Sequence, residues 1–343
     1  MDSVAARGPS RLLVLGGTAW LGAAVAREAL SREHEVVCLA RGESGPAPEG
    51  ARLVRADRTG PGAYDALADL EIDSVVEVSW QPDLVRSALE ALAERVAHWV
   101  YVSSVSVYTD DATPGADESA RVHPAWTGTG PVTIEEYGPA KVACEEAVRG
   151  RLGARRCTIA RTGLIAGYGD RSDRFGYWPA RMARARETER VLVPPPDSPV
   201  QAIDVLDLAA WLVDCAERRT GGTFNATGNT LPFERVLTSC SSATGRQVIP
   251  VPAEDDWLVS HGVEPYMGPE SLPLWVPRTG YGGHSTRRND AAKAAGLRLR
   301  PIEGTVHDAL RWERELGLDR ARRAGLTPER ERSLLCELSG GAD

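Results

Sequence analysis

The sequence predicts an α/β protein with a doubly wound parallel (Rossmann) sheet and a smaller C-terminal substrate-binding region. Short, wholly apolar runs recur along the first half of the chain, as expected for strands buried on both faces of a parallel sheet. Segments with helical spacing of apolar residues separate them, which is the order of a doubly wound fold. The first run ends in a glycine-rich turn that leads into a helix. With 343 residues, the chain is long enough for a large nucleotide domain and a smaller partner.

Each strand of the predicted sheet is one of these apolar runs. They lie at residues 12–15, 36–40, 53–56, 74–78, 99–103 and 157–160. Between the fourth and fifth runs, Leu84, Ala88, Leu92 and Val96 recur at helical spacing and predict a crossover helix. Further helices are predicted over residues 135–149 and 205–218, and polar loops over residues 109–132 and 163–174.

The order of these elements predicts two regions. Residues 1–165 form the dinucleotide-binding domain, and residues 200–227, a strand and then a helix, return to it. Residues 166–199 and 228–343, which lack strong periodicity, form a smaller substrate-binding region that we expect to close over the ligand.

Composition and charge limit the classes of partner. The net charge of −8 argues against nucleic acid, which requires a basic surface. No apolar run approaches the roughly 18 residues that span a bilayer. Residues 1–10 lack the apolar core of a signal peptide, so we expect a cytoplasmic protein with no membrane attachment. The six cysteines and six histidines are scattered, so we expect buried free thiols, no metal and a small-molecule substrate.

The stretch from Leu12 to Gly22 predicts the dinucleotide site. Gly16 permits a tight turn after the first strand, and Gly22 permits the helix to lie close to that strand. A helix that begins here directs backbone N–H groups and the positive end of its dipole at a pyrophosphate. Alanine, and not glycine, occupies the middle position of this glycine-rich motif. Its assignment as a dinucleotide site therefore depends on its position between a strand and a helix. The turn residues expected to contact the dinucleotide are Gly16, Thr18, Ala19, Trp20, Leu21 and Gly22.

Tyr137 and Lys141 are the candidate acid–base pair. Their i, i+4 spacing places both side chains on one face of a helix, and an ammonium group beside a phenol lowers the pKa of the phenol. Ser104 follows the fifth strand, where ligands bind in this fold class, and its hydroxyl can hydrogen-bond a carbonyl during hydride transfer. The alternative is a surface lysine beside a packing tyrosine. It is disfavoured because only two of the 40 basic residues, Lys141 and Lys293, are lysines.

Three segments together resemble the extended short-chain dehydrogenase/reductases, and within them the actinobacterial, reductase-like branch of the NAD-dependent epimerase/dehydratase family. They are the glycine turn, the strand end SSVSVY at residues 103–108, and YGPAK at residues 137–141. The resemblance extends from Arg11 to Thr227. It implies that Tyr137 is the general acid/base, that Lys141 binds the nicotinamide ribose, and that Ser104 orients the substrate carbonyl. It also implies a homodimer formed through the helix that bears Tyr137.

The same resemblance extends to the rest of the cofactor site. Asp57 matches the acid that contacts adenine, and Val78, Ser79 and Thr162 are assigned to the site with it. An acid after the second strand suits the ribose 2′-hydroxyl of NAD, whereas an arginine suits the 2′-phosphate of NADP. Arg41 therefore favours NADP(H) over NAD(H), and Glu43 keeps NAD as the alternative.

Candidate substrate residues lie after the fourth and sixth strands. Trp80 and Gln81 point toward the expected cleft, although core packing is the alternative for Trp80. The loop after the sixth strand and the residues that follow it combine arginines with aromatic side chains, which could hold an anionic or planar ligand or could be solvated charge. Its candidates are Arg171, Arg174, Tyr177 and Trp178.

These features favour an NADP(H)-dependent oxidoreductase that reduces a ketone or imine of a small molecule, in secondary metabolism. A nucleotide-sugar epimerase with tightly bound NAD is the alternative. A dehydratase is disfavoured, because the resemblance implies an Asp-Glu pair directly after the strand-end serine, where this chain has Val105 and Ser106. A non-catalytic nucleotide sensor is disfavoured because the Tyr137–Lys141 pair is intact.

Overall fold

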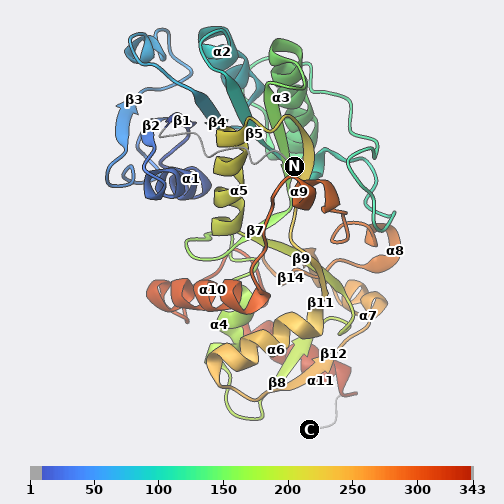
Figure 1. Cartoon of the computed structure of the whole chain (residues 1–343). Helices are drawn as coiled ribbons and strands as arrows, with labels where there is room; N and C mark the ends of the chain where they lie inside the picture. Colours follow the sequence, from blue (N-terminus) through green and yellow to red (C-terminus); the bar gives the residue numbers. More distant parts are fainter. Residues whose placement is uncertain (1–9, 341–343) are drawn as a thin grey trace.

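A parallel sheet of seven strands organises the N-terminal half of the protein (Figure 1). The computed structural model describes residues 10–340; the N-terminal stretch in which no signal peptide is expected lies, but for its last residue, outside the described residues. The strand order is β10-β6-β5-β4-β1-β2-β3, which confirms the predicted doubly wound fold. The bounds are β1 (Arg11–Leu15), β2 (Glu35–Ala40), β3 (Arg52–Arg55), β4 (Ser74–Glu77), β5 (His98–Ser104), β6 (Cys157–Thr162) and β10 (Gly222–Ala226).

The sheet has its topological switch point between β1 and β4. From β1 the chain moves outward through β2 and β3, then crosses to β4 and moves the opposite way through β5 and β6. Ligands of such sheets bind in the crevice at the carboxyl ends of the two central strands. The glycine turn follows β1, so it lies at this crevice.

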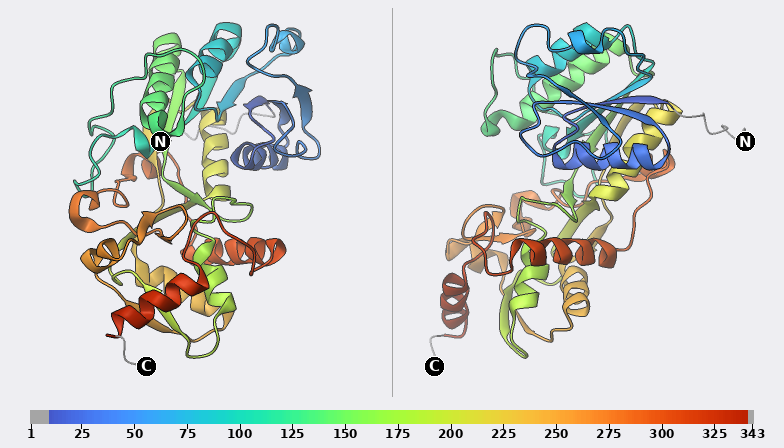
Figure 2. Two further views of the ribbon diagram at one scale, coloured as in Figure 1. Left: turned by 180° about the vertical axis from the view of Figure 1, so that it is seen from behind. Right: turned by 90° about the vertical axis from the view of Figure 1, so that its left-hand side faces the viewer.

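Helices cover both faces of the sheet (Figure 2). Helices α1 (Trp20–Ser31) and α5 (Val205–Arg218) pack on one face, and α2 (Pro82–Leu92) and α3 (Tyr137–Leu152) on the other. Strand β1 contributes alternate residues to the two layers, with Leu12 and Val14 in the core under α1 and α5 and Leu13 and Leu15 in the core under α2 and α3. Because both faces are buried, the strand is apolar throughout.

The C-terminal region has a core of its own. Large aromatic side chains dominate it, namely Phe175, Tyr177, Trp178, Phe233 and Trp275. Its strands are β7 (Leu164–Ala166), β8 (Arg190–Val193), β9 (Pro199–Asp204), β11 (Thr230–Pro232), β12 (Ile249–Pro252), β13 (Glu264–Tyr266) and β14 (Ser271–Pro273). Its helices are α4 (Tyr177–Arg184), α6 (Phe233–Thr244), α7 (Asp255–Ser260), α8 (Arg278–Tyr281), α10 (Ile302–Leu316) and α11 (Pro328–Leu338). Helix α9 (Asp290–Ala294) packs instead against β10 of the main sheet.

Two elements differ from the sequence prediction. The expected loop over residues 163–174 contains the short strand β7, which directly follows β6. Strand β9 pairs with β7 and β11 in a separate three-stranded sheet and does not join the main sheet, although helix α5 after it does pack there. The cause is local, because β7 leaves the main sheet immediately after β6 and offers β9 a parallel partner.

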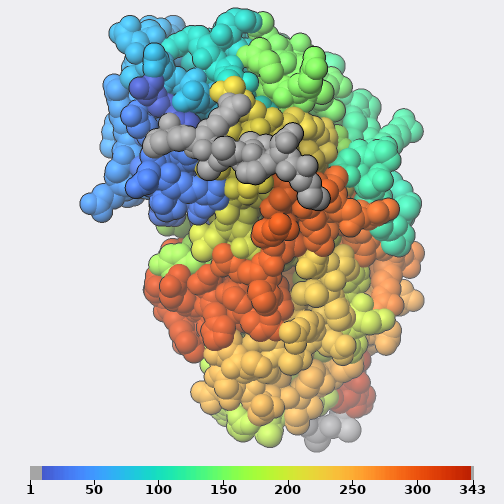
Figure 3. Space-filling view, in the orientation of Figure 1, coloured from blue at the N-terminus to red at the C-terminus, as the bar shows by residue number. Residues whose placement is uncertain are grey.

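The last third of the chain returns to the main domain. The indole of Trp211 in α5 donates to the carbonyl of Ala295 (3.3 Å), and Arg300 pairs with Asp207 (2.8 Å). In Figure 3 this returning segment, coloured orange, covers part of the junction. Among the helices of residues 10–340, none is long and apolar enough to cross a membrane, and these residues contain no cluster of three His, Cys, Asp or Glu side chains suited to a metal ion.

Candidate active site

The turn after β1 has the close packing that a dinucleotide cradle needs. Gly16 has φ +92°, and a Cβ there would lie 2.6 Å from Cγ2 of Val78. A Cβ on Gly22 would collide with the carbonyl oxygen of Gly16, so only glycine lets α1 start this close to the strand. Both glycine roles predicted from the sequence agree with this geometry.

The first turn of α1 is open to an anion. Its N-cap, Ala19, has no side chain that could accept a hydrogen bond, and the first turn has no acid. The N–H groups of this turn therefore lack both intrahelical partners and a side-chain cap. Thr18 is buried in the turn, and Trp20 donates its indole N–H to the carbonyl of Tyr168 (2.8 Å). Leu21 packs against the core beneath α1. The cradle thus fits a dinucleotide pyrophosphate.

Two arginines lie at the carboxyl ends of β2 and β3. Arg41 follows β2 and pairs with Glu43 at 3.0 Å, and both side chains are exposed (60% and 67%). A Cβ on Gly42 would lie 2.6 Å from the guanidinium of Arg55, so that second cation is close by. The sequence analysis missed Arg55, which could have been found from its place at the end of the neighbouring strand. Together they could hold a 2′-phosphate.

Asp57 lies in the turn after β3. One carboxylate oxygen accepts from the backbone N–H (3.0 Å) and hydroxyl (2.8 Å) of Thr59. These hydrogen bonds hold the pKa of Asp57 below its usual value, and the charge of Arg41 adds to the effect. The side chain is thus fixed and ionised at the edge of the crevice.

Tyr137, Lys141 and Ser104 converge at the crevice. Tyr137 begins α3, and the Nζ of Lys141 lies 5.9 Å from the centre of its ring. Lys141 is buried, and its ammonium donates to the carbonyls of Val102 (2.6 Å) and Ser79 (3.2 Å). Because an ammonium has three hydrogens, these two acceptors leave one N–H for a bound group. Ser104 ends β5, and its hydroxyl donates to that of Ser106 (3.1 Å) and lies close enough to Tyr137 to lower the pKa of the phenol.

The shifts in the pKa values of Tyr137 and Lys141 differ from the sequence prediction. Burial raises the pKa of Tyr137, and the neighbouring hydroxyl of Ser104 and the charge of Arg174 only partly offset this. Burial also lowers the pKa of Lys141 to about 8. The expectation that Lys141 gives Tyr137 a pKa below its ordinary value is therefore wrong for this structure, because desolvation dominates both groups.

The other predicted cofactor residues lie at the ends of neighbouring strands. Val78 packs against Gly16, and the carbonyl of Ser79 accepts from Lys141. Thr162 ends β6, is buried, and donates its hydroxyl to the carbonyl of Ser103 (2.9 Å). Val78 and Ser79 thus border the crevice, while the hydroxyl of Thr162 is used within the sheet.

Trp80 and Gln81, which follow β4, make different contacts. The ring of Trp80 contacts that of Tyr137 edge-on, with 5.3 Å between centres, so Trp80 forms a wall of the site. The side-chain amide of Gln81 donates to the carbonyl of Val132 (3.1 Å) and accepts from its N–H (2.8 Å). Both polar atoms of Gln81 thus hold the end of the loop over residues 109–132, and its role as a substrate contact stays a prediction.

Arg174 is the residue of the predicted substrate loop that reaches the site. Its guanidinium lies 5.3 Å from the ring centre of Tyr266, and its charge lowers the pKa of Tyr137. Tyr266 has φ +66°, a strained conformation for a tyrosine, and its ring meets that of His284 edge-on at 4.8 Å. The sequence analysis missed Tyr266 and His284, which lie in a segment without periodicity.

The remaining candidates of this segment differ in burial. Arg171 is exposed, and its role as a substrate contact stays a prediction. Tyr177 and Trp178 are wholly buried in the C-terminal core, where the indole of Trp178 donates to the carbonyl of Pro273 (2.8 Å). Their assignment as substrate contacts is wrong, because they begin a short helix whose apolar face is covered on all sides.

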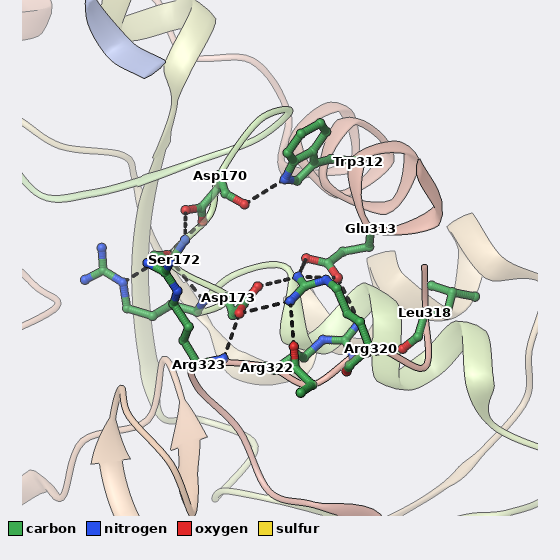
Figure 4. Close-up of polar contacts among 11 residues, drawn as sticks. Asp170, Ser172, Asp173, Trp312, Glu313, Leu318, Arg320, Arg322 and Arg323 are labelled. Carbon is green, nitrogen blue, oxygen red and sulfur yellow. Dashed lines mark hydrogen bonds and ion pairs between the residues drawn. The ribbon is translucent and has the colours of Figure 1, made fainter. Parts of the chain in front are cut away.

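A buried ionic network fixes the loop that bears Arg174 (Figure 4). Asp173 accepts from the guanidinium of Arg320 and from the backbone N–H of Arg323 (2.8 Å). Glu313 pairs with Arg320 (3.1 Å) and Arg322 (2.8 Å). The carbonyl of the neighbouring Asp170 accepts from the indole of Trp312 (2.8 Å), so α10 and the segment after it hold the loop in place.

The part of the chain that carries the glycine turn, the strand-end serine and the Tyr–Lys pair is matched by a family model. The model for the NAD dependent epimerase/dehydratase family matches residues 12–226. The chain belongs to this family. The family assignment confirms the resemblance and establishes an NAD(P)-dependent enzyme of the short-chain dehydrogenase/reductase type.

Relatives within and near the epimerase/dehydratase family differ in activity. The chain is 29% identical over 259 residues to 2′-dehydrokanamycin reductase of Streptomyces kanamyceticus, covering 72% of this chain and 70% of that protein. It is 28% identical over 274 residues to dTDP-6-deoxy-L-talose 4-dehydrogenase (NAD(P)(+)) of Kitasatospora kifunensis, covering 72% of this chain and 84% of that protein. The structure of the UDP-Glc/GlcNAc 4-epimerase from Campylobacter jejuni matches with a TM-score of 0.66, 16% identity and coverage of 89% and 99%. This last likeness concerns the fold alone.

Proposed function

We propose that the protein is an NADP(H)-dependent reductase that acts on a ketone or imine of a small molecule, with Tyr137 as proton donor. The observation that supports this most is the convergence of Tyr137, Ser104 and the buried ammonium of Lys141 at the switch point of the sheet. Reductase and dehydrogenase names among the relatives agree with this reaction class.

The roles of the three side chains follow from their positions. The bound nicotinamide supplies the hydride. The Ser104 hydroxyl donates a hydrogen bond to the substrate oxygen and holds it near Tyr137. As negative charge develops on that oxygen, Tyr137 transfers its phenolic proton to it, giving the alcohol. Lys141 is fixed by two carbonyls, so its remaining N–H would be free to hold the nicotinamide ribose, and its charge would stabilise the phenolate.

The walls of the site suit this chemistry. The ring of Trp80 shields one side of Tyr137 from water, and burial keeps the phenol protonated at neutral pH. A protonated phenol is the form that a reductase needs at the start of its reaction.

The preference for NADP(H) is supported by the cations after β2 and β3. Arg41 and Arg55 flank Gly42, where an NAD-specific site would place an acid. A nucleotide-sugar epimerase that retains NAD is the second candidate. The ion pair of Arg41 with Glu43 favours it, because that pair neutralises the cation and leaves a carboxylate close to the ribose position.

The decisive experiment compares the wild type with Tyr137→Phe. NADPH oxidation is followed with a panel of keto sugars and cyclic ketones, and dinucleotide binding is measured separately by fluorescence. We expect wild-type turnover with at least one ketone and loss of turnover with retained NADPH binding in the variant. Full turnover by Tyr137→Phe would reject the acid–base role. NAD that copurifies and cannot be exchanged would favour the epimerase.

We further propose that the protein works in secondary metabolism, as a cytoplasmic homodimer. The 2′-dehydrokanamycin reductase among its relatives supports the first point. The exposed faces of α2 and α3, which pack side by side, are the expected dimer surface. Sedimentation of the purified protein tests the dimer.

A further inference from the structure

Glu77 is a charged side chain at the centre of the main sheet. It ends β4, lies opposite Leu15 at the start of the glycine turn, and is fully buried. A buried carboxylate is costly unless it is paired and fully hydrogen-bonded. Its position between the glycine turn and β5 indicates a role beyond packing.

Arg58 neutralises this carboxylate by forming a bidentate ion pair with it. Its Nη1 donates to Oε1 of Glu77 (2.9 Å) and its Nη2 to Oε2 (2.7 Å). The guanidinium also donates to the carbonyl of Leu84 (2.6 Å) and to the hydroxyl of Tyr64 (3.0 Å). Arg58 is nearly as buried as Glu77, so the pair is fixed in position.

The same carboxylate orients the peptide that receives the lysine. Oε1 of Glu77 accepts from the backbone N–H of Ser79 (2.9 Å). The carbonyl of Ser79 then accepts from Nζ of Lys141 (3.2 Å) and from the hydroxyl of Tyr101 (3.2 Å). A continuous path of hydrogen bonds thus joins Arg58, Glu77, Ser79 and Lys141.

We propose that Glu77 is a positioning residue for Lys141, acting by its charge and by its hold on the Ser79 peptide, with Arg58 as its counter-ion. This inference rests on the proposed function of Lys141. No reacting atom touches Glu77, so its effect on the reaction passes through the lysine.

The charged and titratable groups around Lys141 come from three elements. Glu77 faces it from β4 and Tyr101 from β5, while its own helix contributes Tyr137, Cys144 and Glu145. Glu77 and Glu145 both raise the pKa of Lys141, against the larger effect of burial. Glu145 differs from Glu77 in its partners, since it bonds to Arg161 (2.8 Å), Arg149 (2.6 Å) and the hydroxyl of Ser103 (2.6 Å). Of the two acids, Glu77 is the one bonded to the Ser79 peptide.

The test reads the ionisation of Lys141 directly. The chain has only two lysines, so protein labelled with 13C at lysine Cε gives two signals, and Lys293→Arg assigns them. In the wild type we expect the Lys141 signal to titrate near pH 8. In Glu77→Gln, which leaves the Arg58 cation without its counter-charge, we expect this midpoint to fall by about one pH unit.

Arg58→Gln provides the opposite perturbation. It leaves the Glu77 carboxylate uncompensated, so the Lys141 midpoint is expected to rise. Because the two substitutions remove charges of opposite sign, coupling of this pair to Lys141 predicts shifts of opposite sign. The matched control is Glu313→Gln, which neutralises an equally buried, arginine-paired glutamate in the C-terminal region and should leave the midpoint unchanged. If one variant fails to fold, the sign of the shift in the other still tests the proposal.

Unchanged midpoints, or shifts of the same sign in both variants, would overturn the proposal. The alkaline limb of kcat/KM for NADPH oxidation should move with the NMR midpoint. The NMR titration needs no turnover, so its result is separate from the proposed function. That function fails if Lys141→Met still reduces ketones at the wild-type rate.

Discussion

Replacing Arg41 with alanine tests which dinucleotide the site prefers. The side chain is 60% exposed, so its attraction to a 2′-phosphate is close to the value for opposite charges in water. Two unit charges 4 Å apart attract by about 1 kcal/mol in water, and the second charge of a phosphate roughly doubles this. We therefore expect Kd for NADPH to rise roughly 5- to 30-fold, and Kd for NADH, which lacks the phosphate, to change less than about 2-fold.

The assay is a fluorescence titration with both reduced dinucleotides at low and high salt. Because the contact is exposed, its contribution should shrink as salt rises. Glu43→Gln removes the competing partner of Arg41 and should tighten NADPH, while Arg52→Ala removes an exposed arginine from the opposite end of β3 and serves as control. Equal losses of affinity for NADPH and NADH in Arg41→Ala would refute the assignment of Arg41 to the 2′-phosphate. Weaker NADPH binding in Glu43→Gln would also refute it.

Three other perturbations address the turn, the lysine and the ionic network. Gly22→Ala forces a methyl group against the carbonyl of Gly16. We expect this variant to keep a native circular dichroism spectrum and to show no dinucleotide binding by calorimetry. Wild-type affinity would contradict the assignment of this turn as the pyrophosphate site. Lys141 is protonated below its pKa of about 8 and neutral above it, so turnover should decline as the pH rises through 8, and a flat profile to pH 10 would count against an ammonium role. Asp173→Asn breaks a buried pair with Arg320 and should lower the free energy of unfolding in urea by about 3 kcal/mol; an unchanged midpoint would show the network to be dispensable.

The main sheet could be predicted from the sequence because its strands are buried on both faces. A run such as Leu12 to Leu15 has no polar position to obscure it, and the glycine turn marks where it ends. Strand β7 escaped prediction since three residues are too few to show a period. The pairing of β9 with β7 was not predicted either, because it depends on where β7 leaves the main sheet.

The catalytic side of the site was more predictable than the substrate side. Tyr137, Lys141 and Ser104 lie at strand or helix ends whose spacing is visible in the sequence. Tyr266, at the end of the short strand β13, and His284, in a turn, come together only in the folded chain. Aromatic residues beside a polar loop suggested ligand contacts, yet burial assigns Tyr177 to the core. The direction of the shift in the pKa of Tyr137 was equally hidden, since desolvation depends on the whole surroundings of the ring.

The hydrogen bond from Trp20 to Tyr168 links the two ligand sites mechanically. Trp20 is the first residue of α1, and a Cβ on Gly169 would lie only 2.7 Å from its indole nitrogen, so the helix start and the loop that leads to Arg174 are in close contact. If a pyrophosphate at the start of α1 displaces Trp20, this contact carries the displacement to the loop. Linkage then requires a ligand beside Arg174 to change the affinity for the dinucleotide by the same factor as the dinucleotide changes the affinity for that ligand.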